Sequence, residues 1–496
     1  MVEAARPGIA THFLRYSLGS VLVMLAGVVS FPVMARLLDY TQYGLLGIFD
    51  SVVLVLAAVF KFGGQHAALR FYPHQGGAGA LAGYGANQIL IPFLGSCVLW
   101  AVAMVVFATA PQLARYAHGA AGWLALTSLL PTIWISMTAA LMMAQERSGL
   151  NVLVNAGSRW LNVVAVLGIV YFVSRTASGV YAGRLTVELL VAIALAAWVW
   201  RQKVPMHWRD RDWVQVFAGV RYGVPLMANE IAVILLITVD RLMLQGLTGS
   251  TDAVGVYSVG ASLALQVSVM LHAALNISYF QVSVRQFETE GAGAVVRTKR
   301  RVLNVLIYVV VAAMAGLLAV GRDAFLLLTG PSKAESVPVF VTLCLMFVAG
   351  GLVDLCASGL QLYKRSMTVL TLSSLAAVVN VLLNVLLIPR FGVMGAVYAT
   401  LGSAATFGAG SWIACPRDLF ALPNTQTTVL ALGLGALVLW VAWMTQLFGL
   451  ASHHARLAAM ASLEAVLFAG PALMLDHNLR NALLEQWQRW RRSRSD

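Results

Sequence analysis

Charged side chains are scarce in this chain. They make up 11% of its 496 residues, whereas hydrophobic residues make up 60%. A soluble globular domain is about 25% charged, so this composition excludes an ordinary soluble protein. It predicts an all-α polytopic membrane protein, because helices satisfy their own backbone hydrogen bonds inside lipid.

Cysteine is equally rare. The four cysteines, Cys97, Cys344, Cys356 and Cys415, lie inside apolar runs and lack the spacing of metal or redox motifs. We expect them to be small buried hydrophobic residues. The sequence therefore predicts no metal site and no bound cofactor.

Motifs of catalysis are missing as well. The chain contains neither a phosphate-binding loop of the P-loop type nor a Ser/His/Asp set with a characteristic spacing. The longest connections between apolar runs, at about 63–86, 201–218 and 284–300, leave no room for a catalytic domain outside the membrane. We expect that the protein is not an enzyme and has no catalytic residues. The N-terminal residues lead into a full-length apolar run, which predicts that no signal peptide is removed.

Long apolar runs are what the chain has in abundance. Read with a window of about 20 residues, they predict about fourteen transmembrane helices. The predicted spans are 12–35, 43–62, 87–110, 121–144, 150–173, 178–200, 219–246, 255–283, 301–320, 338–362, 366–389, 393–415, 427–448 and 456–475.

Lysine and arginine are distributed unevenly between the predicted loops. With the N-terminus placed in the cytoplasm, most of the 33 Lys and Arg residues fall on the cytoplasmic side. This asymmetry follows the positive-inside rule and predicts that both termini are cytoplasmic. Because topology accounts for the net charge of +13, we expect no nucleic-acid partner.

Short motifs recur along the chain at nearly the same separation. Residues 180–182 (Val-Tyr-Ala) recur at 397–399, and the pattern around Gly44 recurs around Gly255. The recurrence predicts two six-helix bundles, 1–200 and 219–415, in parallel pseudo-repeat, joined by a basic cytoplasmic linker at 201–218. Two additional transmembrane helices at 416–476 and a basic amphipathic cytoplasmic tail at 477–496 complete the predicted organisation.

Ionisable residues interrupt several of the predicted spans. An ionisable side chain at the centre of a transmembrane helix costs about 2.5–3.5 kcal/mol, so such residues usually face a wet cavity or a partner. Arginines in such a position indicate a path for an anion. The residues concerned are Asp50, Arg159, Arg184, Glu188, Glu230, Asp354 and Glu464.

Helical spacing places some of these residues on common faces. Arg159 shares a face with Asn151, Asn155 and Asn162. Arg184 and Glu188 are one turn apart. Further pairs on one face are Asp50 with Lys61, Glu230 with Arg241, and Asp354 with Ser358.

Ordinary explanations compete with a functional one. Polar side chains also hydrogen-bond between packed transmembrane helices, Arg184 and Glu188 could form a simple ion pair, and Arg241 could reach the headgroups from the outer end of its span. Glu464 lies outside the repeated region and is expected to be structural. Arg159 differs, because no acid lies three or four residues away on its own helix.

Several segments resemble one family of transporters. They are residues 35–44, beginning Ala-Arg-Leu-Leu and ending Tyr-Gly; residues 239–242, followed by 254–257; and residues 390–396. Across residues 12–415 the chain resembles bacterial polysaccharide transporters, the Wzx-type O-antigen flippases. These belong to the multidrug/oligosaccharidyl-lipid/polysaccharide superfamily, and the two last spans fit its fourteen-helix members.

The resemblance implies a function in the bacterial inner membrane. The protein would move an undecaprenyl-diphosphate-linked oligosaccharide repeat unit from the cytoplasmic to the periplasmic leaflet by alternating access. Such units build O-antigen, capsule or exopolysaccharide. The implied partners are the lipid-linked glycan, membrane lipids, and a polysaccharide polymerase with its chain-length regulator.

The expected site combines these implications with the residue patterns. We expect Arg159, Arg184 and Arg241 to neutralise the diphosphate, with Asn155, Asn162 and Glu188 also contacting the substrate. Ion coupling or gating is expected at Asp50, Glu230 and Asp354, with protons and sodium both open as the coupled ion.

Three alternatives stay open. Two belong to the same superfamily: a cation-coupled multidrug antiporter, which would favour an acidic, aromatic-lined pocket, and a lipid II flippase. The third is a membrane glycan polymerase or ligase, which would need a sizeable outside loop.

Overall fold

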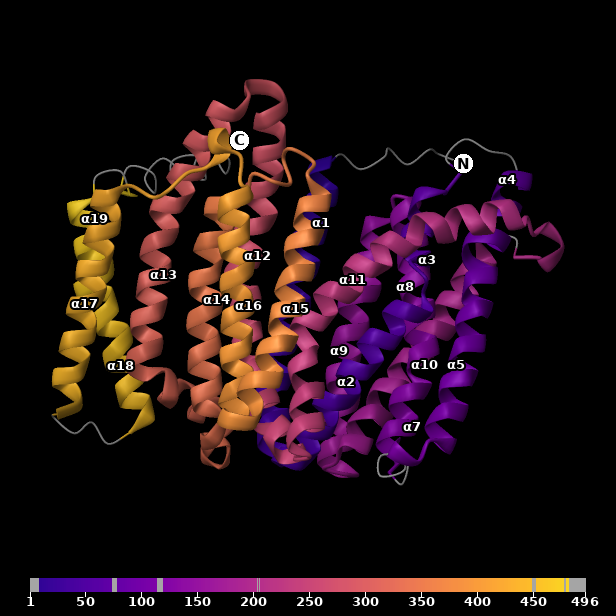
Figure 1. Ribbon diagram of the computed structural model, residues 1–496, viewed down its shortest axis with the longest axis horizontal. Helices are drawn as coiled ribbons and strands as arrows, with labels where there is room; N and C mark the ends of the chain where they lie inside the picture. The colour runs from indigo at the N-terminus through magenta and orange to yellow at the C-terminus, as the bar shows by residue number, and fades with distance from the viewer. Residues whose placement is uncertain are drawn as a thin grey trace. The chain divides into compact units, whose positions relative to one another are not determined.

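The computed structural model describes residues 9–73, 78–113, 119–202, 204, 206–447, 452–476 and 479–480 (Figure 1). The chain divides into two compact units, Met1–Ser258 and Val259–Asp496. The predicted bundle boundaries, drawn from the sequence repeat, stay a prediction. The predicted tail at 477–496 lies outside the described residues, apart from 479–480.

The first unit is built from helices throughout its described part. Its elements are α1 (Ile9–Leu37), α2 (Tyr40–Phe60), α3 (Gly64–Arg70), α4 (Ala78–Tyr84), the π-helix η1 (Gly85–Leu90), α5 (Ile91–Thr109), the short η2 (Pro111–Leu113), α7 (Ala120–Thr127), α8 (Leu129–Ala144), α9 (Ser148–Phe172), α10 (Ala177–Arg201), the short η3 (Trp208–Asp210) and α11 (Trp213–Thr248). The helix α12 (Thr251–Glu290) begins in this unit.

The second unit continues with the rest of α12. Its further elements are α13 (Ala292–Thr329), the 3₁₀ helix η4 (Pro331–Ser336), α14 (Val337–Ala357), α15 (Ser366–Phe391), α16 (Val393–Ala414), η5 (Arg417–Leu419), α17 (Thr425–Leu447), α18 (His453–Leu463), the π-helix η6 (Glu464–Ala469) and α19 (Gly470–Leu475).

Thirteen helical stretches among the described residues are long and apolar enough to cross a membrane. The predicted twelfth span is also a helix, α16, with 22 residues. Its many Gly, Ala, Ser and Thr residues make it less apolar than the others. The prediction of an all-α polytopic membrane protein with about fourteen transmembrane helices is therefore confirmed.

The core of the first unit lies where α2, α9 and α10 meet. Leu46 of α2, Val170 of α9 and Tyr181 of α10 are all buried in it. Trp160 of α9 donates its indole N–H to the carbonyl of Leu22 in α1, at 3.1 Å. This packing fixes the faces of α9 and α10 that carry the predicted arginines.

The beginnings of α2 and α12 make a reciprocal contact. Thr41 donates a hydrogen bond of 2.5 Å to Asp252, which lies 211 residues further along the chain. A Cβ atom on Gly44 would overlap the backbone carbonyl of Thr251, and a Cβ on Gly255 would overlap that of Tyr40. Glycine allows this close approach of two backbones. The same separation of 211 residues relates the two glycines and the two carbonyls, and it equals the separation of the sequence patterns around Gly44 and Gly255.

Both helices also begin in the same way. Asp39 caps α2 by accepting a hydrogen bond from the backbone N–H of Gln42 at 2.8 Å. Ser250 caps α12 by accepting from the N–H of Ala253 at 3.2 Å. Asp and Ser are favoured at this position because their side chains satisfy an N–H that has no partner in the first turn.

The two additional helices pack on α13, and Figure 1 shows α17 and α18 beside it. Asp476 accepts hydrogen bonds from Tyr308 of α13 at 3.0 Å and from Thr427 of α17 at 3.1 Å. Glu464 lies at the start of the π-helix η6, where a Cβ on Gly316 of α13 would meet its carboxylate at 2.5 Å. The place of Glu464 in this packing agrees with the structural role expected for it.

Candidate functional site

The charged centre of the first unit is a pair between α2 and α10. Arg184 Nη1 lies 2.5 Å from Asp50 Oδ1, and both side chains are half-buried. Tyr181, one turn before Arg184, donates its hydroxyl to the same oxygen at 2.6 Å. The Arg184 guanidinium lies 5.3 Å from the centre of the Tyr181 ring. Asp50 is therefore held by two donors from one face of α10.

The contact differs from the simple ion pair with Glu188 that the sequence left open as an alternative for Arg184. Because Asp50 accepts two hydrogen bonds from α10, the tertiary contact replaces the local one. Glu188 instead has Thr132 of α8 as its hydrogen-bond neighbour, and its buried Oε2 atom has no hydrogen-bond partner in the part of the chain that the structure describes. Glu188 still lies close enough to Arg184 for an electrostatic interaction.

Arg159 occupies the exposed face of α9. Within the described ranges it forms no hydrogen bond or ion pair, although Arg184 and Asp50 lie close enough to act on it electrostatically. Its five N–H donors are thus available to a ligand. This agrees with the sequence, in which no acid lies three or four residues from Arg159 on its own helix.

The asparagines predicted beside Arg159 are only partly engaged. Asn155 is exposed and donates to the carbonyl and side-chain oxygens of Asn151, at 2.9 and 2.8 Å. Asn162 is half-buried. The face predicted from the spacing therefore exists on α9, with Asn155 and Arg159 at its exposed part.

Arg241 lies on α11 beside the start of α12. Its Nε atom donates to the Ser258 hydroxyl at 3.2 Å, while the neighbouring Asp240 accepts from Tyr257 at 2.6 Å. Tyr43 of α2 lies within electrostatic range of Arg184, Asp50 and Arg241. Arg241 and the Arg184–Asp50 pair thus both lie within electrostatic range of the same tyrosine.

Glu230 of α11 is held by the junction of α2 and α3. Its Oε1 accepts from Lys61 at 2.8 Å and its Oε2 from Gln65 at 2.8 Å. The shared faces predicted from the spacing gave no sign of this contact. The contact ties α11 to the junction of α2 and α3, where Phe62 and Gly63 adopt left-handed backbone conformations.

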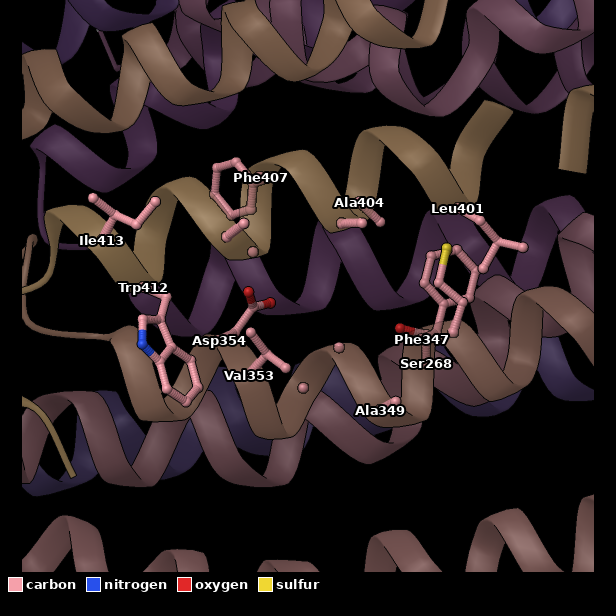
Figure 2. Close-up of a pocket in the computed structure, with 16 residues that line it drawn as sticks. Ser268, Phe347, Ala349, Val353, Asp354, Leu401, Ala404, Phe407, Trp412 and Ile413 are labelled. Carbon is pink, nitrogen blue, oxygen red and sulfur yellow. The ribbon is translucent and has the colours of Figure 1, made fainter. Parts of the chain in front are cut away.

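Asp354 lies in the second unit, in a groove with a volume of about 870 Å³. Residues of α14 and α16, with Ser268 of α12, line this groove (Figure 2). Asp354 is exposed and is the one charged residue among the described residues that line the groove. The structure thus places Asp354 in the second unit and the predicted arginines in the first.

Sequence reasoning missed three hydroxyl groups of the first unit, namely those of Tyr181 and Tyr257, which donate to Asp50 and Asp240, and that of Ser258, which accepts from Arg241. Tyr181 belongs to the repeated Val-Tyr-Ala motif, and Tyr257 follows the repeat around Gly255. Recurrence in a motif was a signal for both. Among the described residues, no group of His, Cys, Asp and Glu could hold a metal ion.

The chemistry of the first unit suits an anion. Among the described residues Arg159 has no hydrogen-bond partner, and Arg184 and Arg241 of the same unit have partners of their own. A guanidinium offers planar, paired N–H donors that match the oxygens of a phosphate group.

Comparisons with known proteins connect this arrangement to a family. A family model described as "Polysaccharide biosynthesis protein" matches residues 10–280, which is more than half of the chain. "Probable flippase AglR" of Haloferax volcanii is 29% identical over 187 residues, which cover 37% of this chain and 39% of that protein. The chain thus aligns with less than half the length of this relative.

Two solved structures share the fold. The lipid II flippase MurJ, in an inward closed conformation, superposes with a TM-score of 0.72 at 10% identity, covering 94% of this chain and 99% of that one. An inward-facing multidrug resistance transporter of the MATE family, in the MOP superfamily, gives a TM-score of 0.60 at 13% identity, covering 88% and 99%. With the family model matching more than half of its length, this chain belongs to the family of polysaccharide biosynthesis proteins.

Proposed function

We propose that this protein is a flippase that moves an undecaprenyl-diphosphate-linked oligosaccharide repeat unit to the outer face of a bacterial inner membrane. The observation that carries the proposal is Arg159, an exposed guanidinium within a membrane span that has no acid partner among the described residues. Family membership and the likeness to a protein named as a flippase support it.

The diphosphate would bind at the exposed face of α9. Arg159 would donate to the phosphate oxygens, and its positive charge would offset the loss of water around the anion. Arg184 is held by Asp50 and Arg241 by Ser258, so both would add positive potential from fixed positions. Asn155 and Asn162 would supply hydrogen bonds to the sugar next to the diphosphate.

Membrane potential could drive the movement. Moving one charge across 100 mV changes the free energy by about 2.3 kcal/mol, so a head group with about two negative charges gains roughly 4–5 kcal/mol on moving outward from a negative interior. Coupling to protons or sodium through Asp50, Glu230 or Asp354 would add to this force during alternating access. The cytoplasmic position of both termini and the action with a polymerase and a chain-length regulator belong to the same proposal.

The substitution Arg159→Ala tests the role of the free guanidinium. In cells that depend on this protein for a surface glycan, the variant should lose at least about 90% of glycan export, which corresponds to a loss of about 1.4 kcal/mol. The lipid-linked unit should accumulate on the cytoplasmic leaflet while the protein level in the membrane stays normal. Arg322→Ala, which removes an exposed arginine of α13, is the matched control and should export normally. Normal export by Arg159→Ala would contradict the proposal.

A further inference from the structure

Glu188 of α10 is a carboxylate that the proposed function does not use. Its Oε2 atom is buried and has no hydrogen-bond partner among the described residues, while Thr132 of α8 is its hydrogen-bond neighbour. A buried polar atom without a partner is costly, and more so when its group is ionised. The residue as a whole is half-buried, so a proton can reach its carboxyl group. Binding a proton would remove the charge of this group without displacing a neighbour.

Four helices pack most closely on α10, namely α2, α7, α8 and α9, and the structure describes all of their side chains. Two of them, α7 and α8, contain no ionisable residue. The ionisable groups gathered around Glu188 therefore come from α2, α9 and α10 itself. They are Asp50 and Tyr43 of α2, Arg159 of α9, and Tyr181 and Arg184 of α10.

Glu188 differs from the other carboxylates of this unit in how it is held. Asp50 accepts from Arg184 at 2.5 Å and from the Tyr181 hydroxyl at 2.6 Å. Glu230 likewise accepts from two donors, at 2.8 Å each. A proton on either group would displace a donor that is already in place. No donor has to leave the Oε2 atom of Glu188, so a proton binds there without breaking a hydrogen bond.

The charges of the cluster balance when its four charged groups are ionised. Arg159 and Arg184 are positive, and Asp50 and Glu188 are negative. A diphosphate bound to Arg159 would add about two negative charges within the membrane-spanning part, where uncompensated charge is costly. Because like charges repel, the bound anion favours the neutral form of Glu188. Uptake of one proton by this carboxyl group would lower the excess negative charge by one.

We propose that Glu188 is a proton-binding site that takes up a proton when a diphosphate binds to the first unit. The proton adds to the Oε2 atom of the carboxylate, which becomes a neutral carboxyl group beside the Thr132 hydroxyl. It leaves again when the anion is released. This inference rests on the proposed flippase function and adds a regulation of its binding site, because binding of the diphosphate becomes stronger as the pH falls.

Binding of farnesyl diphosphate at several pH values tests the proposal. The full chain in lipid nanodiscs is titrated by calorimetry in buffers with different ionisation enthalpies, which gives the number of protons taken up. Glu188→Gln places a neutral group at the same position. This variant should take up at least about half a proton less than the wild type. At about pH 8.5 it should bind at least about threefold more tightly, because the repelling charge is gone.

Glu464→Gln is the matched control. The Oε1 atom of Glu464 is also buried without a hydrogen-bond partner in the described part of the chain, but this residue belongs to the second unit. The control should keep the proton uptake and the affinity of the wild type. The diphosphate also titrates by itself, and its contribution is the same for every variant. Differences between variants therefore report on the protein.

Infrared difference spectra detect the proton directly. In a detergent without ester groups, adding farnesyl diphosphate to the wild type should produce the C=O stretching band of a protonated carboxyl group. The band should be absent in Glu188→Gln and present in Glu464→Gln. It should be displaced in Thr132→Val, which removes the hydroxyl beside the carboxyl group. This last variant keeps the test decisive if Glu188→Gln does not fold.

The outcomes distinguish this site from the flippase function. A wild type that does not bind farnesyl diphosphate, or that binds it no more tightly than Arg159→Ala does, would contradict the proposed function itself. Three results would overturn the proton site alone. The first is equal proton uptake by Glu188→Gln and the wild type. The second is weaker binding by Glu188→Gln at every pH, which would make Glu188 a direct contact of the substrate. The third is a wild-type affinity that depends on sodium and not on pH.

Discussion

Two arginines of the first unit differ in their surroundings, and this difference separates their roles. Arg184 is held at 2.5 Å from Asp50, whereas Arg159 is exposed without an acid partner in the described ranges. A compensated charge orders the helices around it, whereas an uncompensated one is available to a ligand. Substitutions at the two positions should therefore have different consequences.

Asp50→Asn should affect stability. The substitution leaves the half-buried Arg184 without its counter-charge, and removing one member of a buried pair is destabilising. Since both side chains are partly exposed, we expect a loss of about 1–2 kcal/mol, seen as a lower Tm of the purified protein in detergent. The double variant Asp50→Asn with Arg184→Gln should recover part of the loss. Equal Tm values for Asp50→Asn and the wild type would contradict a stabilising role for the pair.

The candidate residues could be chosen from the sequence, but the contacts that they make could not be predicted from it. The sequence shows which ionisable residues lie in apolar runs. It also shows that no acid lies three or four residues from Arg159. The partners of Arg184 and Glu230 come from helices far away in the sequence, at separations of 134 and 169 residues. Helical spacing reports only neighbours on the same helix, which is why it offered Glu188 as a partner for Arg184 and none for Glu230.

Two close contacts join helices of the first unit to one another. At one, Gly44 and Gly255 bring the starts of α2 and α12 together. At the other, Lys61 and Gln65 hold Glu230 of α11 to the junction of α2 and α3. The first contact follows from backbone shape and the second from charge.

Gly44→Val should disrupt the helix crossing. Its side chain would overlap the backbone carbonyl of Thr251, which cannot rotate away as a side chain could. Overpacking of this kind costs about 1–3 kcal/mol, and we expect a lower Tm together with reduced transport. Gly246→Ala on α11 is the matched control, because its new methyl group would meet no atom within 4 Å. If Gly44→Val is as stable as the Gly246→Ala control, the close approach of α2 and α12 is not needed for stability.

Glu230→Gln should loosen α11. Lys61 is buried and would lose its charged partner, while Gln65 would lose a carboxylate acceptor. We expect faster hydrogen exchange in the first turns of α3 and a Tm lower than that of the wild type. Adding Lys61→Met should restore part of the stability, because it removes the unpaired charge. If the double variant is less stable than Glu230→Gln alone, the ion pair is not what joins these helices.

At the scale of the whole molecule, the sequence predicted the membrane fold well. Hydropathy located the helices because the lipid interior requires long apolar segments with satisfied backbones. The less apolar α16 was predicted in the same way, as the apolar run 393–415. The helix limits were less predictable. The expected span 219–246 lies within α11, which begins at Trp213, because a helix can extend beyond the lipid.

The surroundings of Asp354 could not be predicted from the sequence. The sequence marked Asp354 as an acid in an apolar run, with ion coupling or gating as its expected role. The neighbouring Trp412 comes from α16, and its approach depends on the glycine and alanine contacts between α14 and α16. Because the two helices pack in this way, the Asp354 carboxylate and the Trp412 indole line the same groove.

The central claim is that this chain moves a lipid-linked glycan across the membrane, and reconstitution tests it most directly. The purified protein is placed in liposomes with a fluorescent undecaprenyl-diphosphate oligosaccharide, and a potassium gradient with valinomycin sets the potential. Exposure of the glycan on the opposite leaflet is followed with an added glycosidase. We predict exposure that is faster with a potential favouring outward movement of anions, retained by Arg322→Ala and lost in Arg159→Ala. Exposure no faster than in protein-free liposomes, or equal in Arg159→Ala and the wild type, would contradict the account.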